Sequence, residues 1–387
     1  MRIGRRMLCI AILGASACSR ADGEPAAIES AASTAPTELS DTAESAAPLP
    51  QADGWEELPQ GPWSGRLFGS TFAVIGNDVL AWGPEGWAVI DVANQRLRTP
   101  TAPPIGARVD AASVWTGTEL VVWGGYEQTG VALEYPPRGG AYNPLTDTWR
   151  TIATGPIESR TPAVVAWDGR EMFVWGGWRD DGAPSTTSAV TGSSRRQLSD
   201  AAAYDPATDT WRQLTSVPPP GHIESTQIAQ GTPPLLWLDV PDQSVPIYGS
   251  SNVLYAYDRV SDAWTTQPKS PLAGWSPASA TGNEMFVALG QTLTSDGTDV
   301  GLQSQSWSAA SGWQPLPRPS LDTAWVCQTQ VLASGSDIVA RRCTAVSLLR
   351  DGQWIELQRT TNSARLVVTD DWLVSIDTGS IERFHIP

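Results

Sequence analysis

Four arginines occur in similar local settings and could together bind an anion. They end the tripeptides Ser-Gly-Arg66, Gly-Ala-Arg108, Glu-Ser-Arg160 and Ser-Ala-Arg365. A guanidinium group presents a planar fork of donors that matches carboxylates and similar oxyanions, so several such groups at one opening would favour an acidic ligand. A second role stays open, in which each arginine bonds neighbouring loops and contacts no ligand.

Four aromatic residues fall in segments that we expect to be loops. They are Trp63, Tyr126, Trp178 and Trp275. Flat rings beside polar groups suit stacking against sugars or peptides. Loop tryptophans also simply cover the ends of strands, so a structural role is the alternative for each of them.

Catalytic and metal-binding patterns are scarce. The chain has two histidines, His222 and His385, and shows no Ser-His-Asp order, phosphate-binding glycine loop or zinc-ligand spacing. Asp110, Glu224 and Asp322 could act as general acid or base, although carboxylates in such positions are more often surface charges. We therefore expect no metal and no cofactor, and we favour a protein that is not an enzyme.

Composition narrows the range of partners. The 387 residues carry 41 acidic and 25 basic side chains, a formal net charge of −16, and Lys269 is the single lysine. Nucleic acids and anionic membranes attract a basic face, so this balance argues against direct binding to either. The length suits one large domain or two ordinary ones.

The first residues resemble the leader of a bacterial lipoprotein. Three arginines precede the apolar run Met7–Ala17, which is too short to cross a bilayer and is typical of a signal peptide. Cys18 follows a small residue, as in the lipobox, where the cysteine thiol is acylated and becomes the mature N-terminus. We expect residues 1–17 to be a signal peptide and Cys18 to anchor the protein in a bacterial cell envelope, on its periplasmic or surface face.

Residues 18–54 link this leader to the folded part. After Cys18 they consist largely of Ala, Ser, Thr, Glu and Pro, with hardly any large apolar side chain. Such a segment buries too little apolar surface to offset its ordering entropy, so we expect a disordered tether. Residues 55–387 then form one folded domain.

Two further cysteines, Cys327 and Cys343, lie symmetrically about Gly335. If this stretch is a hairpin that turns at Ser334-Gly335-Ser336, the two thiols face each other across neighbouring strands. In an exported protein an isolated pair of cysteines is most simply a disulfide. Two buried free thiols are the alternative.

A repeated phrase organises the chain. Trp123-Gly-Gly is followed by Tyr142-Asn-Pro-Leu-Thr-Asp-Thr-Trp149, and Trp175-Gly-Gly is followed by Tyr204-Asp-Pro-Ala-Thr-Asp-Thr-Trp211. A degenerate third copy runs from Tyr257 to Trp264. A glycine doublet after an apolar strand, then Tyr-Asp/Asn-Pro-x-Thr-x-x-Trp, resembles the kelch repeat. The resemblance implies a β-propeller in which each repeat is a blade of four antiparallel strands, A to D. It also implies that most of the repeated Trp, Tyr and Gly residues are structural.

Seven repeats can be counted. Turns between strands A and B are expected at Gly76, Gly117, Gly169, Gly231, Gly282, Gly335 and Asp370, and the strand D position is taken by Leu97, Trp149, Trp211, Trp264, Trp313 and Trp354. The seventh repeat runs out at Ile381–Pro387, with a strand C and no strand D after it. Trp55–Pro59 has the character of a strand D with nothing before it. We therefore predict an all-β, seven-bladed kelch-type β-propeller of four-stranded blades, closed by the N-terminal strand that completes the last blade.

Function is expected on one face of this ring. The B–C and D–A connections leave a blade on the same face, and the A–B turns leave it on the other. The B–C connections are long in blades 2 to 5, at 124–140, 176–200, 239–252 and 291–301, whereas the A–B turns are short. Long loops on a rigid scaffold commonly bind ligands. The four arginines and four aromatic residues named above all fall on this face.

The sequence thus predicts a ligand-binding or protein-interaction module. We expect an unknown protein or glycan as its partner, with a carbohydrate or an acidic peptide as the ligand, membrane contact through the lipid anchor alone, and a monomer. Galactose oxidase, which resembles this fold class, holds copper with two histidines and two tyrosines. His222 is expected in a D–A loop and His385 in the last strand C, so the two histidines cannot supply that copper site together. The alternative is a carbohydrate-acting epimerase, mutarotase or lyase with carboxylates at the propeller mouth, since propellers host many functions.

Overall fold

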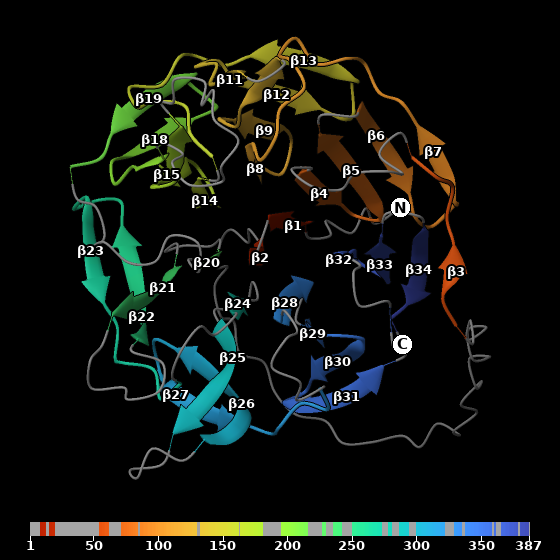
Figure 1. The fold of residues 1–387 in the computed structure, drawn as a ribbon, viewed down its shortest axis with the longest axis vertical. Helices are drawn as coiled ribbons and strands as arrows, with labels where there is room; N and C mark the ends of the chain where they lie inside the picture. The colour runs from red at the N-terminus through yellow and green to blue at the C-terminus, as the bar shows by residue number, and fades with distance from the viewer. Residues whose placement is uncertain are drawn as a thin grey trace, which may run out of the picture.

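The computed structural model shows seven blades of four antiparallel strands each, arranged in a ring around a central axis (Figure 1). It describes residues 8–12, 15–19, 54–61, 71–83, 86–129, 132–161, 163–180, 195–215, 227–229, 235–241, 250–272, 278–280, 286–293, 299–321, 329–334, 337–357, 360, 365–377 and 380–386. These residues form strands, turns and loops and contain no helix. The predicted all-β, seven-bladed propeller is confirmed.

Blades 1 to 6 each contain their four strands in chain order. Blade 1 is β4 (Thr71–Ile75), β5 (Asp78–Gly83), β6 (Gly86–Asp91) and β7 (Arg96–Arg98); blade 2 is β8 (Ala112–Trp115), β9 (Leu120–Trp123), β12 (Gly140–Asn143) and β13 (Thr148–Thr151). Blade 3 is β14 (Val164–Trp167), β15 (Met172–Trp175), β18 (Ala201–Asp205) and β19 (Thr210–Gln213); blade 4 is β20 (Gln227–Ala229), β21 (Leu235–Pro241), β22 (Ser250–Asp258) and β23 (Ala263–Thr266). Blade 5 is β24 (Ala278–Ala280), β25 (Phe286–Leu293), β26 (Asp299–Ser308) and β27 (Gly312–Leu316); blade 6 is β28 (Thr329–Ser334), β29 (Asp337–Arg342), β30 (Ala345–Arg350) and β31 (Gln353–Leu357).

Blade 7 joins the two ends of the domain. It consists of β32 (Arg365–Val368), β33 (Trp372–Ile376), β34 (Ile381–His385) and the N-terminal β3 (Glu56–Glu57). Glu56 lies opposite Arg383 in the ladder, and the Leu58 amide donates to the Ile381 carbonyl at 2.7 Å. The Arg383 side chain also bonds Glu56 at 2.6 Å and the Ala93 carbonyl of blade 1 at 2.8 Å. The predicted closure by the N-terminal strand is confirmed, and Arg383 joins blade 7 to blade 1.

The repeated phrase determines the turn between strands C and D. In blade 3 the Asp205 carboxylate accepts the Ala207 amide at 2.9 Å, and in blade 2 Asn143 accepts the Leu145 amide at the same distance. This local bond between a side chain and the backbone two residues on favours the turn, and proline helps by setting φ. Asp209 then takes the left-handed conformation, with φ at 52°.

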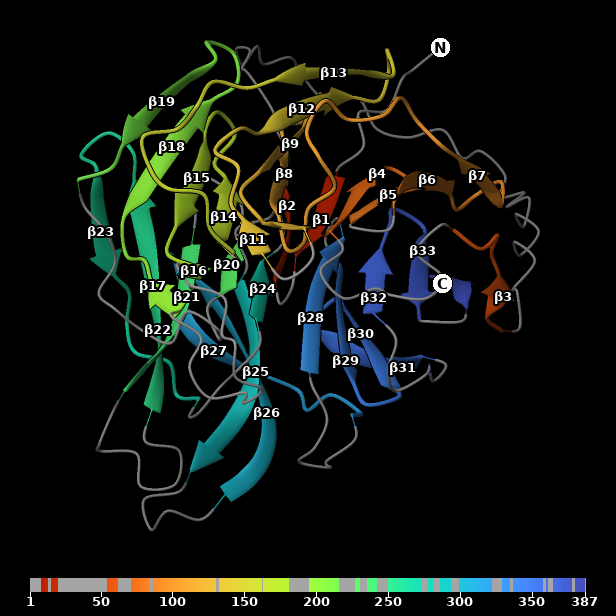
Figure 2. The same ribbon diagram turned by 45° about the horizontal axis from the view of Figure 1, so that its top comes forward.

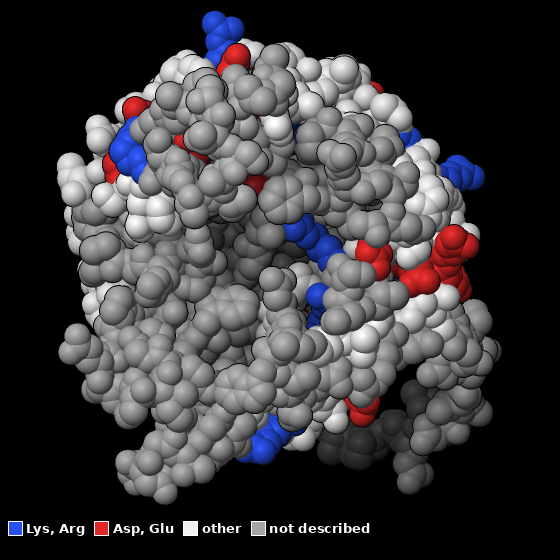
Figure 3. Space-filling view, viewed as in Figure 1, with Lys and Arg blue, Asp and Glu red and all other residues white. Residues whose placement is uncertain are grey.

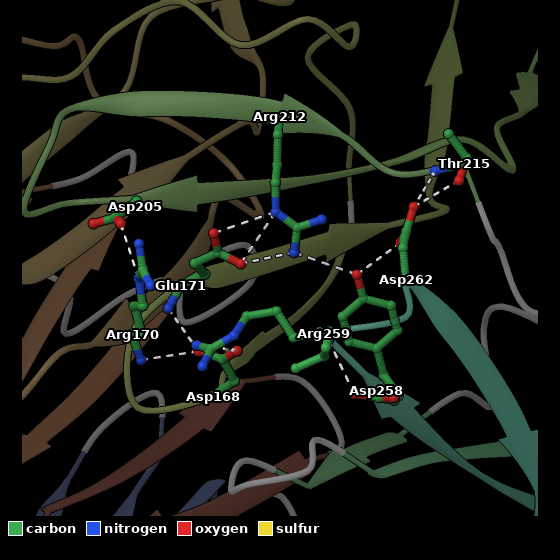
Figure 4. Close-up of polar contacts among 11 residues, drawn as sticks. Asp168, Arg170, Glu171, Asp205, Arg212, Thr215, Asp258, Arg259 and Asp262 are labelled. Carbon is green, nitrogen blue, oxygen red and sulfur yellow. Dashed lines mark hydrogen bonds and ion pairs between the residues drawn. The ribbon is translucent and has the colours of Figure 1, made fainter.

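Tyrosine and aspartate from the same phrase join neighbouring blades. The Tyr257 hydroxyl donates to Asp262 at 2.8 Å, and Asp262 accepts both the amide and the hydroxyl of Thr215, on the connection from blade 3 (Figure 4). Arg212 of blade 3 donates to Glu171 at 2.7 Å and to the Tyr257 hydroxyl at 3.3 Å. The phrase is therefore a cross-blade connector as well as a turn.

The core lies between the faces of adjacent blades. Trp123 and Trp175, which precede the glycine doublets, are fully buried. The Trp123 ring centroid lies 5.6 Å from that of Trp211 in the next blade, and the Trp211 indole donates to the Ala153 carbonyl at 2.8 Å. The expectation that these tryptophans pack within and between blades agrees with these contacts.

Two short strands near the N-terminus lie at the centre of the ring in Figure 1. They are β1 (Leu8–Ile12) and β2 (Ala15–Ser19), which pair with each other; β1 also pairs with β4, and β2 with β24. β1 lies within the predicted leader, residues 1–17, whereas β2 runs past its end and includes Cys18. The removal of the leader and the acylation of Cys18 stay predictions, and residues 20–53 of the predicted tether lie outside the described residues. A helix long and apolar enough to span a bilayer is not found among the described residues.

The hairpin between the last two cysteines differs by one position from the expected register. β28 and β29 pair from Thr329↔Arg342 to Ser334↔Asp337, so the ladder is symmetric about the midpoint of positions 335 and 336 and not about Gly335. Cys343 consequently lies in the turn after β29, with φ at 52°, instead of within a strand. It is disulfide-bonded. Cys327 lies outside the described residues, and its pairing with Cys343 stays a prediction.

Candidate functional site

The long B–C connections of blades 2 and 3 fold into hairpins of their own. In blade 2 the hairpin is β10 (Glu127–Thr129) with β11 (Ala132–Glu134), and in blade 3 it is β16 (Trp178–Asp180) with β17 (Arg195–Gln197). Both rise from the ring on the same face, as Figure 2 shows. In blades 4 and 5 the connections instead lengthen strands B and C.

Backbone bridges attach each hairpin to the start of its own blade. Val109 and Tyr126 exchange two backbone hydrogen bonds, of 2.9 and 3.1 Å, in blade 2. Thr161 and Trp178 do the same in blade 3, at 2.8 and 3.2 Å. The D–A and B–C connections therefore meet on one face, as the sequence predicted.

The glycine doublets make this meeting possible. Gly125 has φ at 73°, and a Cβ there would lie 2.8 Å from the Val109 carbonyl oxygen. Gly124 has the same φ, and a Cβ would lie 2.9 Å from the Arg160 carbonyl oxygen. A side chain at either position would collide with backbone, so the close approach requires glycine.

Arg108 holds the base of the blade 2 hairpin. Its Nη1 donates to the Gly124 carbonyl at 3.0 Å and to the Pro136 carbonyl at 3.4 Å, which are at opposite ends of the B–C connection. Its Nε lies 3.5 Å from Glu127 Oε1. The side chain is 2% exposed, and burial lowers the pKa of the guanidinium while Glu127 opposes that shift.

Arg160 has the equivalent role in blade 3. Its Nη1 donates to the Gly176 carbonyl at 3.3 Å and to the Asp200 carboxylate at 2.5 Å, again at the two ends of one B–C connection. Its Nη2 reaches the other Asp200 oxygen at 3.2 Å, and its Nε donates to the Glu158 carbonyl at 2.7 Å. The side chain is 0% exposed.

These contacts are the ones expected of the second role that the sequence left open, in which each arginine bonds neighbouring loops. Both guanidinium groups are enclosed by carbonyls and a carboxylate of their own blade. Arg108 and Arg160 are also 2% and 0% exposed, so neither is partly exposed at an opening of the ring. The physical reason is that the buried ends of the B–C connection present carbonyl oxygens that need donors. Arg66 lies outside the described residues.

The two hairpins contact each other through Tyr135, which follows β11. Its hydroxyl accepts the Asp180 amide at 3.1 Å, and the Arg179 guanidinium carbon lies 4.9 Å from its ring centroid. The Tyr126 ring centroid lies 6.0 Å from it. We call Tyr126, Tyr135, Arg179 and Asp180 the tyrosine clamp. All four side chains are half-buried, so each keeps part of its surface in solvent.

The structure brings two of the predicted aromatic residues, Tyr126 and Trp178, to this place. Trp178 is half-buried, and its indole N–H has no hydrogen-bond partner among the described residues. Trp63 and Trp275 lie outside the described residues. Sequence reasoning did not single out Tyr135 or Arg179. The feature that could have identified them is that they are an aromatic residue and a cation within the two longest B–C connections.

Arg365 differs from the other two described arginines of the set. It begins β32 in blade 7, and its guanidinium carbon lies 5.3 Å from the ring centroid of Phe72 in blade 1. Burial lowers its pKa, and the charge of Asp110, at the entry to blade 2, opposes that shift. Arg365 and Asp110 therefore act on each other across blade 1.

The residues considered for catalysis are spread apart or undescribed. His385 ends β34 and packs edge-on against Trp372, with ring centroids 4.9 Å apart. His222, Glu224 and Asp322 lie outside the described residues. Within the described ranges, no group of three or more His, Cys, Asp or Glu side chains could hold a metal ion.

Comparison with known proteins adds one sequence relative and one solved structure. No family model matches the chain. It is 25% identical over 266 residues to the Kelch-like protein terF of Aspergillus terreus, covering 62% of this chain and 52% of that protein, so it spans about half the length of this curated relative. The solved structure of YjhT superimposes with a TM-score of 0.47 at 12% identity, over 73% of this chain and 99% of that one.

Proposed function

We propose that this kelch-repeat β-propeller is a binding module that captures a protein or glycan ligand on the tyrosine clamp. We further propose that it is exported and held in the cell envelope by a lipid on Cys18. The propeller fold and the kelch-like relative suggest a binding or interaction module. The long-loop hairpins suggest where on the molecule the binding takes place.

The contact between the two hairpins carries the proposal. Tyr135 of blade 2 receives a backbone N–H from Asp180 of blade 3 and lies against the Arg179 guanidinium. The buried bonds of Arg108 and Arg160 hold the base of each hairpin. A surface that is ordered before binding loses less entropy on association, so binding energy is retained.

The clamp has the composition of a recognition surface. Tyrosine and arginine are enriched where proteins bind partners, because each offers a large contact area together with a polar group. Arg196 and Glu158 extend the surface with an exposed ion pair of 2.7 Å. Tyrosine faces suit the apolar face of a sugar ring or an extended peptide, and Arg179 suits an acidic group on either.

Arrays of glycans and of peptides, including acidic ones, test the proposal on the purified protein. We expect a reproducible set of ligands, with binding weakened about tenfold or more by Tyr126→Ala or Arg179→Ala, the range for residues that anchor an interface. Leu145→Ala is the matched control, because Leu145 is 90% exposed on a C–D turn away from the hairpins. Equal binding by wild type, Tyr126→Ala and Arg179→Ala would place the ligand elsewhere.

Membrane attachment is tested separately. Cys18→Ser is expected to move the protein from the membrane fraction to the soluble fraction and to abolish labelling by a fatty-acid analogue. Unchanged membrane retention would contradict the lipid anchor and would leave the clamp proposal intact.

A further inference from the structure

The strands β1 and β2 cross the centre of the ring and join two of its blades. β1 pairs antiparallel with β4, the inner strand of blade 1, and β2 pairs parallel with β24, the inner strand of blade 5, where Ala17 lies opposite Ala280. Because β1 and β2 also pair with each other, blades 5 and 1 become one continuous sheet of ten strands. Figures 1 and 2 both show this pair of strands at the middle of the ring. We call β1 and β2 the leader hairpin.

The leader hairpin also lies against the inner strands of three other blades. β1 contacts β8 of blade 2 and β28 of blade 6, and β2 contacts β20 of blade 4 as well as β28. The strands β4, β8, β20, β24 and β28 therefore border the hairpin. The central channel of the ring is thus wide enough for two extended strands side by side. The space-filling view in Figure 3 looks down on the same central region.

The pairing of β1 with β4 sets large residues opposite small ones. Ile10 lies opposite Ala73, and Ala11 lies opposite Phe72. Residues that are directly opposite in a ladder are close enough to pack, so a large residue beside a small one fills the space without a clash. This register suits a strand of apolar and small residues, which is the composition of β1 (Leu-Cys-Ile-Ala-Ile) and of β2 (Ala-Ser-Ala-Cys-Ser).

The hairpin pairs with the inner edges of these blades. Within its own blade, β4 pairs with β5, and β24 pairs with β25. The opposite edge of each inner strand is turned to the channel, and its backbone N–H and C=O groups can pair with an extended strand that reaches them. We call these edges of β4 and β24 the channel edges. In the full chain the leader hairpin is their partner.

Processing at Cys18 would take the leader hairpin apart. Removal of residues 1–17 deletes all of β1 and leaves only Cys18 and Ser19 of β2. An acyl chain on Cys18 partitions into a bilayer, so anchoring also draws these two residues away from the centre of the ring. The channel edges of β4 and β24 then lose their partner.

We propose that the channel edges form a binding site for an extended apolar peptide, which the leader hairpin fills in the unprocessed chain. The site opens when residues 1–17 are removed, so the proposal rests on the export and processing proposed above. Main-chain hydrogen bonds supply the affinity, and the alternation of large and small residues sets the register. The tyrosine clamp lies on hairpins that rise from the ring, so the two sites are separate.

The test probe is a peptide of residues 7–20 in which both cysteines are replaced by serine. Its matched control also carries Ile10→Pro and Ala17→Pro, because proline lacks the N–H group and cannot join a central strand. Calorimetry compares the mature chain, residues 18–387, with the full chain, both with Cys18→Ser so that neither carries a lipid. We expect the mature chain to bind the probe saturably. Binding of the proline peptide to the mature chain, and of the probe to the full chain, should be weaker by about tenfold or more.

Hydrogen exchange locates the site. β4 and β24 should exchange more slowly in the full chain than in the mature chain, and the bound probe should restore slow exchange in the mature chain. Tyr126→Ala should weaken binding of the array ligands and leave probe binding unchanged, so the clamp and the channel edges can fail independently.

Three results would overturn the proposal. The first is that the probe does not bind the mature chain, or that the proline peptide or the full chain binds equally well. The second is that the probe protects only strands other than the inner strands of the blades. The third is that protein purified from the envelope retains residues 1–17, since the leader hairpin would then keep the channel filled.

Discussion

Replacing Arg160 with methionine tests whether the blade 3 hairpin depends on one buried side chain. Arg160 joins Gly176 to Asp200, the two ends of the B–C connection. Methionine keeps most of the side-chain length and its apolar packing, so the change removes the charge and its hydrogen bonds with little cavity. We expect a less stable protein whose ring is otherwise unchanged.

The magnitude follows from the exposure of the two partners. Removing one member of a buried ion pair costs about 3–5 kcal/mol when the other charge stays buried. Arg160 is 0% exposed, but Asp200 is 40% exposed and can be hydrated once the arginine is gone. This places the expected loss near the lower limit, about 3 kcal/mol.

Urea unfolding at neutral pH measures this loss as a lower midpoint at unchanged slope. In the Arg160→Met variant, hydrogen exchange should show faster opening of the hairpin strands β16 and β17 than of the blade strands β14 and β15. Arg196→Met is the control, because it removes only the exposed Arg196–Glu158 pair, 46% and 54% exposed, which is worth up to about 1 kcal/mol. If both variants unfold at the same midpoint, Arg160 does not hold the hairpin.

Three further predictions concern the ring. Arg383→Met should lower stability by about 3 kcal/mol in urea unfolding, because it breaks the bonds to Glu56 and the Ala93 carbonyl across the closure; an unchanged midpoint would show that closure does not depend on Arg383. Cys343→Ser should lower the free energy of unfolding by about 2–4 kcal/mol and make the stability of the protein insensitive to reductant. The mass of the wild-type protein after alkylation shows whether Cys327 is the partner of Cys343. Burial raises the pKa of Tyr257 to about 12. Its contribution to the free energy of unfolding is therefore complete below about pH 10 and is lost as the pH rises to about 12. Urea unfolding across that range should show a smaller decline in Tyr257→Phe than in wild type.

The sequence predicted the propeller well because its signals are local. A turn between strands C and D needs only a side chain that accepts an amide two residues on, as Asp205 does for Ala207. A glycine doublet with positive φ is required wherever two backbones meet as closely as those of Gly125 and Val109. Repetition then multiplied these signals, and the leftover strand at Glu56–Glu57 could have only one place in a closed ring.

The hairpin of Cys343 shows where local signals stop. The symmetry of the two cysteines about Gly335 suggested a ladder centred on that residue, but the strands pair as Ser334↔Asp337, which shifts the centre by half a position. Register is set by which side chains fit between blades, and Val339 and Leu348 are buried there. One position is enough to move Cys343 from a strand into a turn.

By itself, the sequence determined the number of blades, their order, the closing strand and the face on which long connections gather. Only the tertiary structure decided what each arginine does. Arg160 meets Asp200, forty positions away, whereas Arg365 meets the ring of Phe72 and the charge of Asp110 in other blades. Backbone turns depend on neighbours in the chain, but a guanidinium group bonds whichever acceptors the folded loops bring within its reach, and similar tripeptides do not encode them.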